Sequence, residues 1–94
     1  MKKEKSVNFE KAFGQILQAI RHEQGFSQEQ LGFESGYHRT YISLLERGQK
    51  SPSLNTIFQL AIALKTTPSE ILQRVEAQVG NISSSNREER AKRK

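Results

Sequence analysis

Hydrogen-bonding side chains recur along one side of the segment 38–47. On a helix of about 100° per residue, one side of this segment carries two arginines, two hydroxyl groups and a leucine, with no acidic residue among them. In sequence order they are Arg39, Thr40, Ser43, Leu44 and Arg47. Arginine can bond guanine through two N–H groups, hydroxyls bond several base acceptors, and apolar carbon contacts the thymine methyl group. An ordinary solvated helix face more often mixes in glutamate and lysine, so the composition favours contact with DNA.

The two histidines, His22 and His38, offer little catalytic or metal-binding chemistry. The chain has no cysteine and no aspartate, so disulfides and thiolate sites are excluded and a metal would need glutamates at unsuitable spacings. A hydrolytic site would need a serine beside a base that a carboxylate orients, and the sequence shows no such combination. We therefore expect no enzyme activity, no metal site and no cofactor.

The net charge of +5 belongs to the two ends of the chain. Residues 1–5 hold three lysines and one glutamate, and residues 87–94 hold five basic and two acidic side chains. The segment 6–86 holds seven basic and seven acidic residues, so its charges cancel. Basic ends can solubilise a protein as well as contact nucleic acid. The argument for DNA binding therefore depends on where charges lie within the neutral segment.

The polar face of 38–47 needs other helices to position it, and apolar residues at helical spacing supply them. A first helix carries a stripe that consists of Phe9, Ala12, Phe13, Ile16, Leu17 and Ile20. Gly25 predicts its end. Ser27 and Gln30 have the spacing of a capping box for a second, short helix that ends at Gly36. A third helix is expected from about His38 to Arg47, before Gly48.

Two further helices follow a loop at 49–52. Ser53 can cap a helix with the stripe Leu54, Ile57, Phe58, Ala61 and Leu64. Thr67 and Pro68 mark the start of the last helix, which carries Ile71, Leu72, Val75 and Val79 and is expected to end before Gly80. The sequence thus predicts one compact all-α domain at 8–80. It also predicts flexible tails at 1–7 and 81–94, the second of them basic, because these segments have too few apolar residues to form a core.

The second and third helices have the spacing of a helix-turn-helix unit. Two short helices can dock only where their backbones approach closely, which requires a small residue such as Gly32. The turn between them requires a residue that accepts a positive φ, and Gly36 supplies it. Apolar side chains must face inward from both helices, as Leu31, Tyr37, Ile42 and Leu45 can.

The segment from Gln28 to Leu72 resembles the Cro/C1-type (XRE) helix-turn-helix family. The matching strings are SQEQL, YISLLERG, SPSLNTIFQLAIAL and PSEIL. Within this family, the short chain and the string HRTYIS are similar to the controller proteins of restriction–modification systems. The resemblance implies a five-helix, lambda-repressor-like DNA-binding domain. It also implies a homodimer that binds an operator, with a recognition helix that begins near His38.

The resemblance also implies roles for individual residues. Gln28 would bond a DNA phosphate and support the third helix, and Arg21 would form an ion pair with Glu46. Arg39, Thr40 and Ser43 would read bases. The DNA backbone would be held by Tyr41 and by the segment from Lys50 to Thr56, which includes Ser53 and Asn55. His38 is also expected among the DNA-binding residues. It stands where serine often caps the recognition helix, and histidine is a weaker cap.

The expected dimer surface lies on the last two helices. Ile62 falls off the apolar stripe of its helix, and we combine it with Ile71, Leu72, Val75 and Val79 as interface residues. The alternative is that the residues of the last helix only close the core of the monomer. Between these two, we expect Ile71 and Leu72 to lie partly in the core, and Val75 and Val79 to lie at the interface.

The sequence therefore favours a transcription regulator that binds a palindromic operator in double-stranded DNA as a homodimer. An antitoxin or other protein-interaction module, with a tail that wraps a partner, is the alternative. We expect a cytoplasmic protein without a membrane segment, a signal peptide or a small-molecule ligand.

Overall fold

The computed structural model describes residues 8–82, and this range is entirely helix and connecting loop. Its five helices are α1 (Phe9–Glu23), α2 (Gln28–Ser35), α3 (Arg39–Glu46), α4 (Leu54–Ala63) and α5 (Pro68–Ile82). The predicted all-α, five-helix architecture is confirmed. None of the described helices is both long and apolar enough to cross a membrane. The predicted arm at 1–7 and residues 83–94 of the predicted tail lie outside the described range.

Side-chain caps begin the helices at the positions that the sequence indicates. The hydroxyl of Ser27 accepts from the backbone N–H of Gln30 at 3.0 Å, and that of Ser53 accepts from Thr56 N–H at 3.0 Å. Thr67 does the same for α5. Each cap satisfies one of the N–H groups that a helix start leaves without a partner.

The end of α5 differs from the prediction. The expected end before Gly80 is wrong, because the helix continues through Asn81 to Ile82. A glycine inside a helix costs only about 1 kcal/mol relative to alanine. It therefore does not end a helix by itself, and Gly80 is buried in this one.

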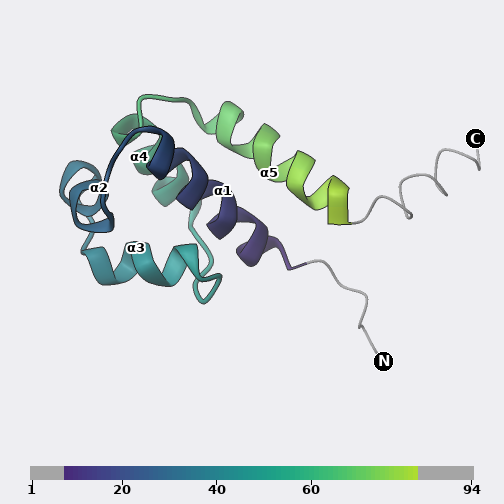
Figure 1. Cartoon of the computed structure of the whole chain (residues 1–94), viewed down its shortest axis with the longest axis horizontal. Helices are drawn as coiled ribbons and strands as arrows, with labels where there is room; N and C mark the ends of the chain where they lie inside the picture. The colour runs from purple at the N-terminus through teal and green to yellow at the C-terminus, as the bar shows by residue number, and fades with distance from the viewer. Residues whose placement is uncertain (1–7, 83–94) are drawn as a thin grey trace, which may run out of the picture.

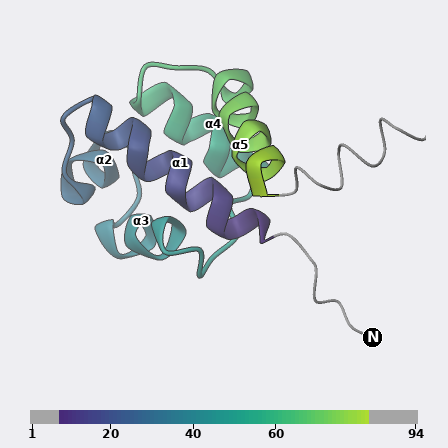
Figure 2. The ribbon, with the colours of Figure 1, turned by 45° about the vertical axis from the view of Figure 1, so that its right-hand side comes forward.

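Helix α1 lies across the middle of the molecule and contacts both α3 and α5 (Figure 1). Helix α2 packs against α3 and α4, and α4 packs against α5. Figure 2 shows α3 on one side of α1, with α4 and α5 on the other. This arrangement leaves one long side of α3 open, which is the side that carries the candidate DNA-reading residues.

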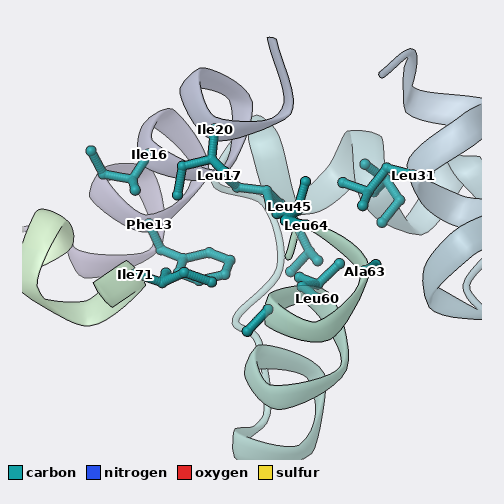
Figure 3. Packing of buried hydrophobic residues seen from close by; sticks show 12 residues of the cluster. Phe13, Ile16, Leu17, Ile20, Leu31, Leu45, Leu60, Ala63, Leu64 and Ile71 are labelled. Carbon is teal, nitrogen blue, oxygen red and sulfur yellow. The ribbon is translucent and has the colours of Figure 1, made fainter. Parts of the chain in front are cut away.

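All five helices contribute to one apolar core. The side chains with no exposed surface at all include Leu17, Leu31, Ile42, Leu45, Leu60, Leu64 and Ile71. Figure 3 shows that the centre of this core is formed by Leu17, Leu45 and Leu64, and that Phe13 packs beside Ile71. Burial of each such side chain stabilises the fold by about 1.5–3 kcal/mol.

Four apolar residues are placed differently from the prediction. Phe9, Leu54 and Phe58 were assigned to inward stripes, but they are 61%, 69% and 50% exposed. Helical spacing identifies residues that share a side, but it does not show how much of that side a neighbouring helix covers. Ile71, which was predicted at a dimer interface, is completely buried in the monomer core and is unavailable to a partner.

Candidate nucleic-acid interface

The α2–α3 turn is built on a close backbone approach at Gly32. A Cβ atom at this position would lie 2.5 Å from the carbonyl oxygen of Tyr37 and 3.2 Å from the backbone nitrogen of Arg39. Gly36 adopts a φ of 85° in the turn. The N–H groups of Gly36 and Tyr37 both donate to the Gly32 carbonyl, at 2.8 and 2.9 Å. Both glycine roles inferred from the sequence are therefore confirmed.

Helix α3 presents the predicted polar face to solvent. Arg39, Thr40 and Arg47 are exposed, and Ser43 and Leu44 are half-buried. On the opposite side, Ile42 and Leu45 are completely buried. The one acidic residue of α3, Glu46, is turned inward and is only 8% exposed. The open side of the helix is therefore free of negative charge.

A hydrogen bond joins two side chains of this face. The Nε of Arg47 donates to the hydroxyl oxygen of Ser43 at 3.2 Å, one helical turn away. This bond leaves the two terminal nitrogens of the Arg47 guanidinium available to other acceptors. The Ser43 hydroxyl can still donate its own hydrogen, so the two side chains can act on neighbouring acceptors of one ligand.

The start of α3 is capped by His38. Its Nδ1 accepts from the backbone N–H of Thr40 at 3.0 Å, and its side chain is exposed. The expectation that histidine replaces serine as the cap of this helix is confirmed.

A buried polar network fixes the other end of α3. Arg21 of α1 donates to Glu46 through Nε at 2.6 Å and Nη2 at 3.0 Å, and its Nη1 donates to the Phe26 carbonyl at 2.8 Å. Gln28 adds a third donor to Glu46, through Nε2 at 2.9 Å. Among the described residues, no buried side-chain nitrogen or oxygen lacks a partner. The predicted ion pair is present, and Gln28 supports α3 as expected.

The sequence analysis did not predict the close contact between Gly14 of α1 and the end of α3. A Cβ atom there would lie 2.5 Å from the Glu46 carbonyl oxygen and closer still to that of Leu45. The backbone of α1 thus rests directly on the last turn of α3. The available signal was a glycine in the middle of an amphipathic helix, away from any turn.

Thr56 was also missed as a junction between α3 and α4. This residue is 4% exposed, and its hydroxyl lies 3.2 Å from the hydroxyls of both Tyr37 and Tyr41 and 3.0 Å from that of Ser53. The two tyrosine rings pack against each other with centroids 5.1 Å apart. The start of α4 is thereby attached to α3. Ser53 and Tyr41 therefore belong to one cluster. Lys50 and Asn55, which precede Thr56 in the sequence, are exposed.

Comparison with known proteins agrees with this geometry. A family model described as helix-turn-helix matches residues 17–71, more than half of the chain. The chain belongs to the helix-turn-helix family.

Named relatives of this helix-turn-helix protein include restriction–modification control proteins. Control protein C.BamHI of Bacillus amyloliquefaciens is 42% identical over 66 residues, which cover 69% of this chain and 82% of that protein. Control protein C.SmaI of Serratia marcescens is 35% identical over 68 residues, covering 72% and 81%. The crystal structure of the restriction–modification controller protein C.AhdI from Aeromonas hydrophila has a TM-score of 0.65 and 45% identity. That comparison covers 66% of this chain and 94% of that one.

Apart from the buried Ile71, the predicted dimer residues of the helix-turn-helix protein leave apolar surface exposed on α4 and α5. Ile62 is 71% and Leu72 43% exposed, while Val75 and Val79 are half-buried. Leu54 and Phe58 extend this area, because they precede Ile62 at four-residue spacing along the same side of α4. The sequence analysis did not identify Leu54 and Phe58 as exposed residues, because their spacing is equally compatible with an apolar stripe that faces the core.

Proposed function

We propose that this protein is a sequence-specific transcription regulator that places α3 in the major groove of a palindromic operator. The observation that carries the proposal is the open side of α3, which exposes Arg39, Thr40 and Arg47 and buries the only acidic residue of the helix. Arginine and hydroxyl groups in that position match the hydrogen-bonding edges of bases. The names of the relatives support the narrower proposal that the chain is a restriction–modification controller protein.

The residues around α3 divide between reading bases and holding the backbone. In helix-turn-helix complexes the N-terminal part of the recognition helix reaches the bases, which assigns Arg39 and Thr40 to that task, with Ser43 and Leu44 one turn further. The amide nitrogen of Gln28 has two hydrogens, and Glu46 uses one of them. The other hydrogen is available to a DNA phosphate. Lys50, Ser53 and Asn55 are grouped at the start of α4 and are proposed to contact the backbone.

Two copies of the chain are proposed to pair through the exposed apolar area of α4 and α5. Its members are Leu54, Phe58, Ile62 and Leu72, with Val75 and Val79 at its edge. Three of them repeat every four residues along one side of α4 and are at least 50% exposed. A row of large apolar side chains is costly to leave in water and is typical of an interface. A two-fold pairing would set the two recognition helices about 34 Å apart, one turn of DNA.

Selection of bound sequences from a random DNA pool tests the DNA-binding proposal. We expect a two-fold symmetric site with half-sites about one helical turn apart. The Arg39→Ala variant should lose about 1–3 kcal/mol of discrimination at one base position. Lys65→Ala, which removes an exposed charge in the loop after α4, should not. Equal loss on scrambled DNA would identify Arg39 as a phosphate contact, and selection of no preferred sequence would refute the proposal.

Sedimentation of an Ile62→Glu variant tests the proposed pairing. A carboxylate in the middle of the apolar row should convert dimers to monomers. Phe33→Glu is a matched control, because Phe33 is 82% exposed on α2, outside this row, and its replacement should leave the dimer intact. A dimer that persists in Ile62→Glu would exclude α4 as the interface.

A further inference from the structure

The cap of α3 fixes the hydrogen position on the ring of His38. Nδ1 accepts the hydrogen bond from the Thr40 backbone N–H. A ring nitrogen that accepts carries no hydrogen, so the neutral imidazole must carry its hydrogen on Nε2. The cap therefore selects one of the two tautomers, in which Nε2–H is a hydrogen-bond donor.

That donor is directed away from the helix that the ring caps. The two nitrogens lie on different sides of the imidazole ring, and Nδ1 faces the first turn of α3. The His38 side chain is exposed, as are its neighbours Arg39 and Thr40. Within residues 8–82 the only hydrogen bond of this ring is the cap. Nε2–H thus lies on an exposed ring at the N-terminal end of α3, without an internal partner in this range.

We propose that His38 is a donor of fixed direction, whose Nε2–H bonds an acceptor oxygen or nitrogen of the operator. The acceptor is either a phosphate oxygen or the edge of a base. This inference rests on the proposed function, since it requires α3 to face DNA. A serine or aspartate would be a stronger cap, but aspartate has no donor and would repel phosphates. Histidine combines a cap on one nitrogen with an N–H on the other.

Two substitutions separate these two tasks in the full-length protein. In His38→Asn the amide oxygen can replace Nδ1 as the cap, but the side chain is too short to reach as far as Nε2. In His38→Gln the amide N–H extends about as far as Nε2, whereas the cap is weakened. We expect His38→Asn to unfold at the same or a higher urea concentration than the wild type. Its affinity for the selected operator should fall about three- to tenfold, the effect of one lost hydrogen bond.

We expect the opposite pattern for His38→Gln, with lower stability and a smaller loss of affinity. Thr67→Ala, which removes the cap of α5, controls for lost stability alone and should bind the operator as the wild type does. Binding to operators substituted at single positions distinguishes the two acceptors. A loss in His38→Asn that is equal on all of them indicates a phosphate, and a loss that disappears at one position indicates that base.

Nitrogen-15 NMR of the imidazole provides the structural test. In alkaline buffer the spectrum should show the hydrogen of His38 on Nε2, and a hydrogen on Nδ1 would overturn the proposal. Undiminished operator binding by His38→Asn would overturn it as well. In either case the proposed function would stand as long as the wild type selects a symmetric site. Failure of the wild type to select any site would instead remove both proposals.

Discussion

The α2–α3 unit and the α4–α5 pair are held in place by different kinds of contact. Both contribute fully buried leucine and isoleucine side chains to the core. The α2–α3 unit adds directional contacts, namely the Arg21–Glu46 network and the backbone approaches at Gly14 and Gly32. The α4–α5 pair is linked to α1 by an exposed ion pair, in which Arg74 bonds Glu23 at 2.8 Å. Hydrogen bonds restrict orientation more narrowly than apolar packing does, so the helix proposed to read DNA is the more tightly oriented one.

Among the substitutions that test this difference, removal of one charge from the buried network should lower the free energy of unfolding most. Arg21→Met leaves Glu46 buried with Gln28 as its remaining side-chain partner, and we expect a loss of about 3–5 kcal/mol in the free energy of unfolding. The double variant Arg21→Met with Glu46→Leu should recover most of that loss, because no unpaired charge remains. Urea unfolding of the three proteins measures both values. A single variant as stable as the wild type would show that the network does not anchor α3.

Gly14→Ala should be the next most damaging change. Alanine favours a helix by about 1 kcal/mol over glycine, yet its methyl group would collide with the carbonyl oxygens at the end of α3. We expect a net loss of about 1–3 kcal/mol, the usual cost of overpacking. Gln18→Ala, at an exposed position of the same helix, should be close to neutral in the same urea titration. A gain in stability for Gly14→Ala would show that α1 and α3 can separate at little cost.

Thr56→Val tests the junction between the two regions. Valine keeps the shape of threonine but cannot bond the hydroxyls of Tyr37, Tyr41 and Ser53. We expect a loss of about 1–2 kcal/mol, because the tyrosine hydroxyls are only partly buried and water can replace the bonds. Thr56→Ser retains the hydroxyl and should recover part of the loss. If valine and serine behave alike in thermal unfolding, the junction depends on packing rather than on hydrogen bonds.

Loss of the exposed ion pair should have the smallest effect. The hydrogen bond from Arg74 lowers the pKa of Glu23 below its ordinary value of 4.5, so the pair contributes fully above that pH. Its contribution declines as the pH falls through the lower folded-state pKa. Glu23→Gln should therefore unfold with a lower free energy than the wild type near neutral pH, and the difference between the two proteins should shrink in acid. The difference should also be small at high salt. Urea titrations of both proteins from neutral pH to below the pKa of Glu23 would measure this difference. A difference that grows in acid would contradict the ion pair's contribution to stability.

Local signals in the sequence were sufficient for the helices and for the α2–α3 turn. Caps such as Ser27 and turn glycines such as Gly36 act within a few residues, so their partners are known from spacing. The Arg21–Glu46 pair joins residues 25 positions apart, and it was expected only from the family resemblance.

The features that sequence analysis missed depend on how helices meet. Gly14 matters because α3 lies against it, and Thr56 matters because it is reached by Tyr37 from the α2–α3 turn and by Tyr41 from α3. Leu54 and Phe58 have core spacing, but no helix among the described residues covers them. The spacing of apolar residues identifies one face of a helix, but it does not show which other helix packs against that face.

The hydroxyl cluster around Thr56 has a consequence for the geometry of the proposed DNA complex. It links the recognition helix by hydrogen bonds to the helix that carries the apolar row Leu54, Phe58 and Ile62. If the apolar row pairs two copies, the separation and relative angle of the two recognition helices are determined inside each monomer, by groups that touch neither DNA nor the partner. Substitution of Thr56 could then change the preferred number of base pairs between half-sites while each half-site sequence stays the same.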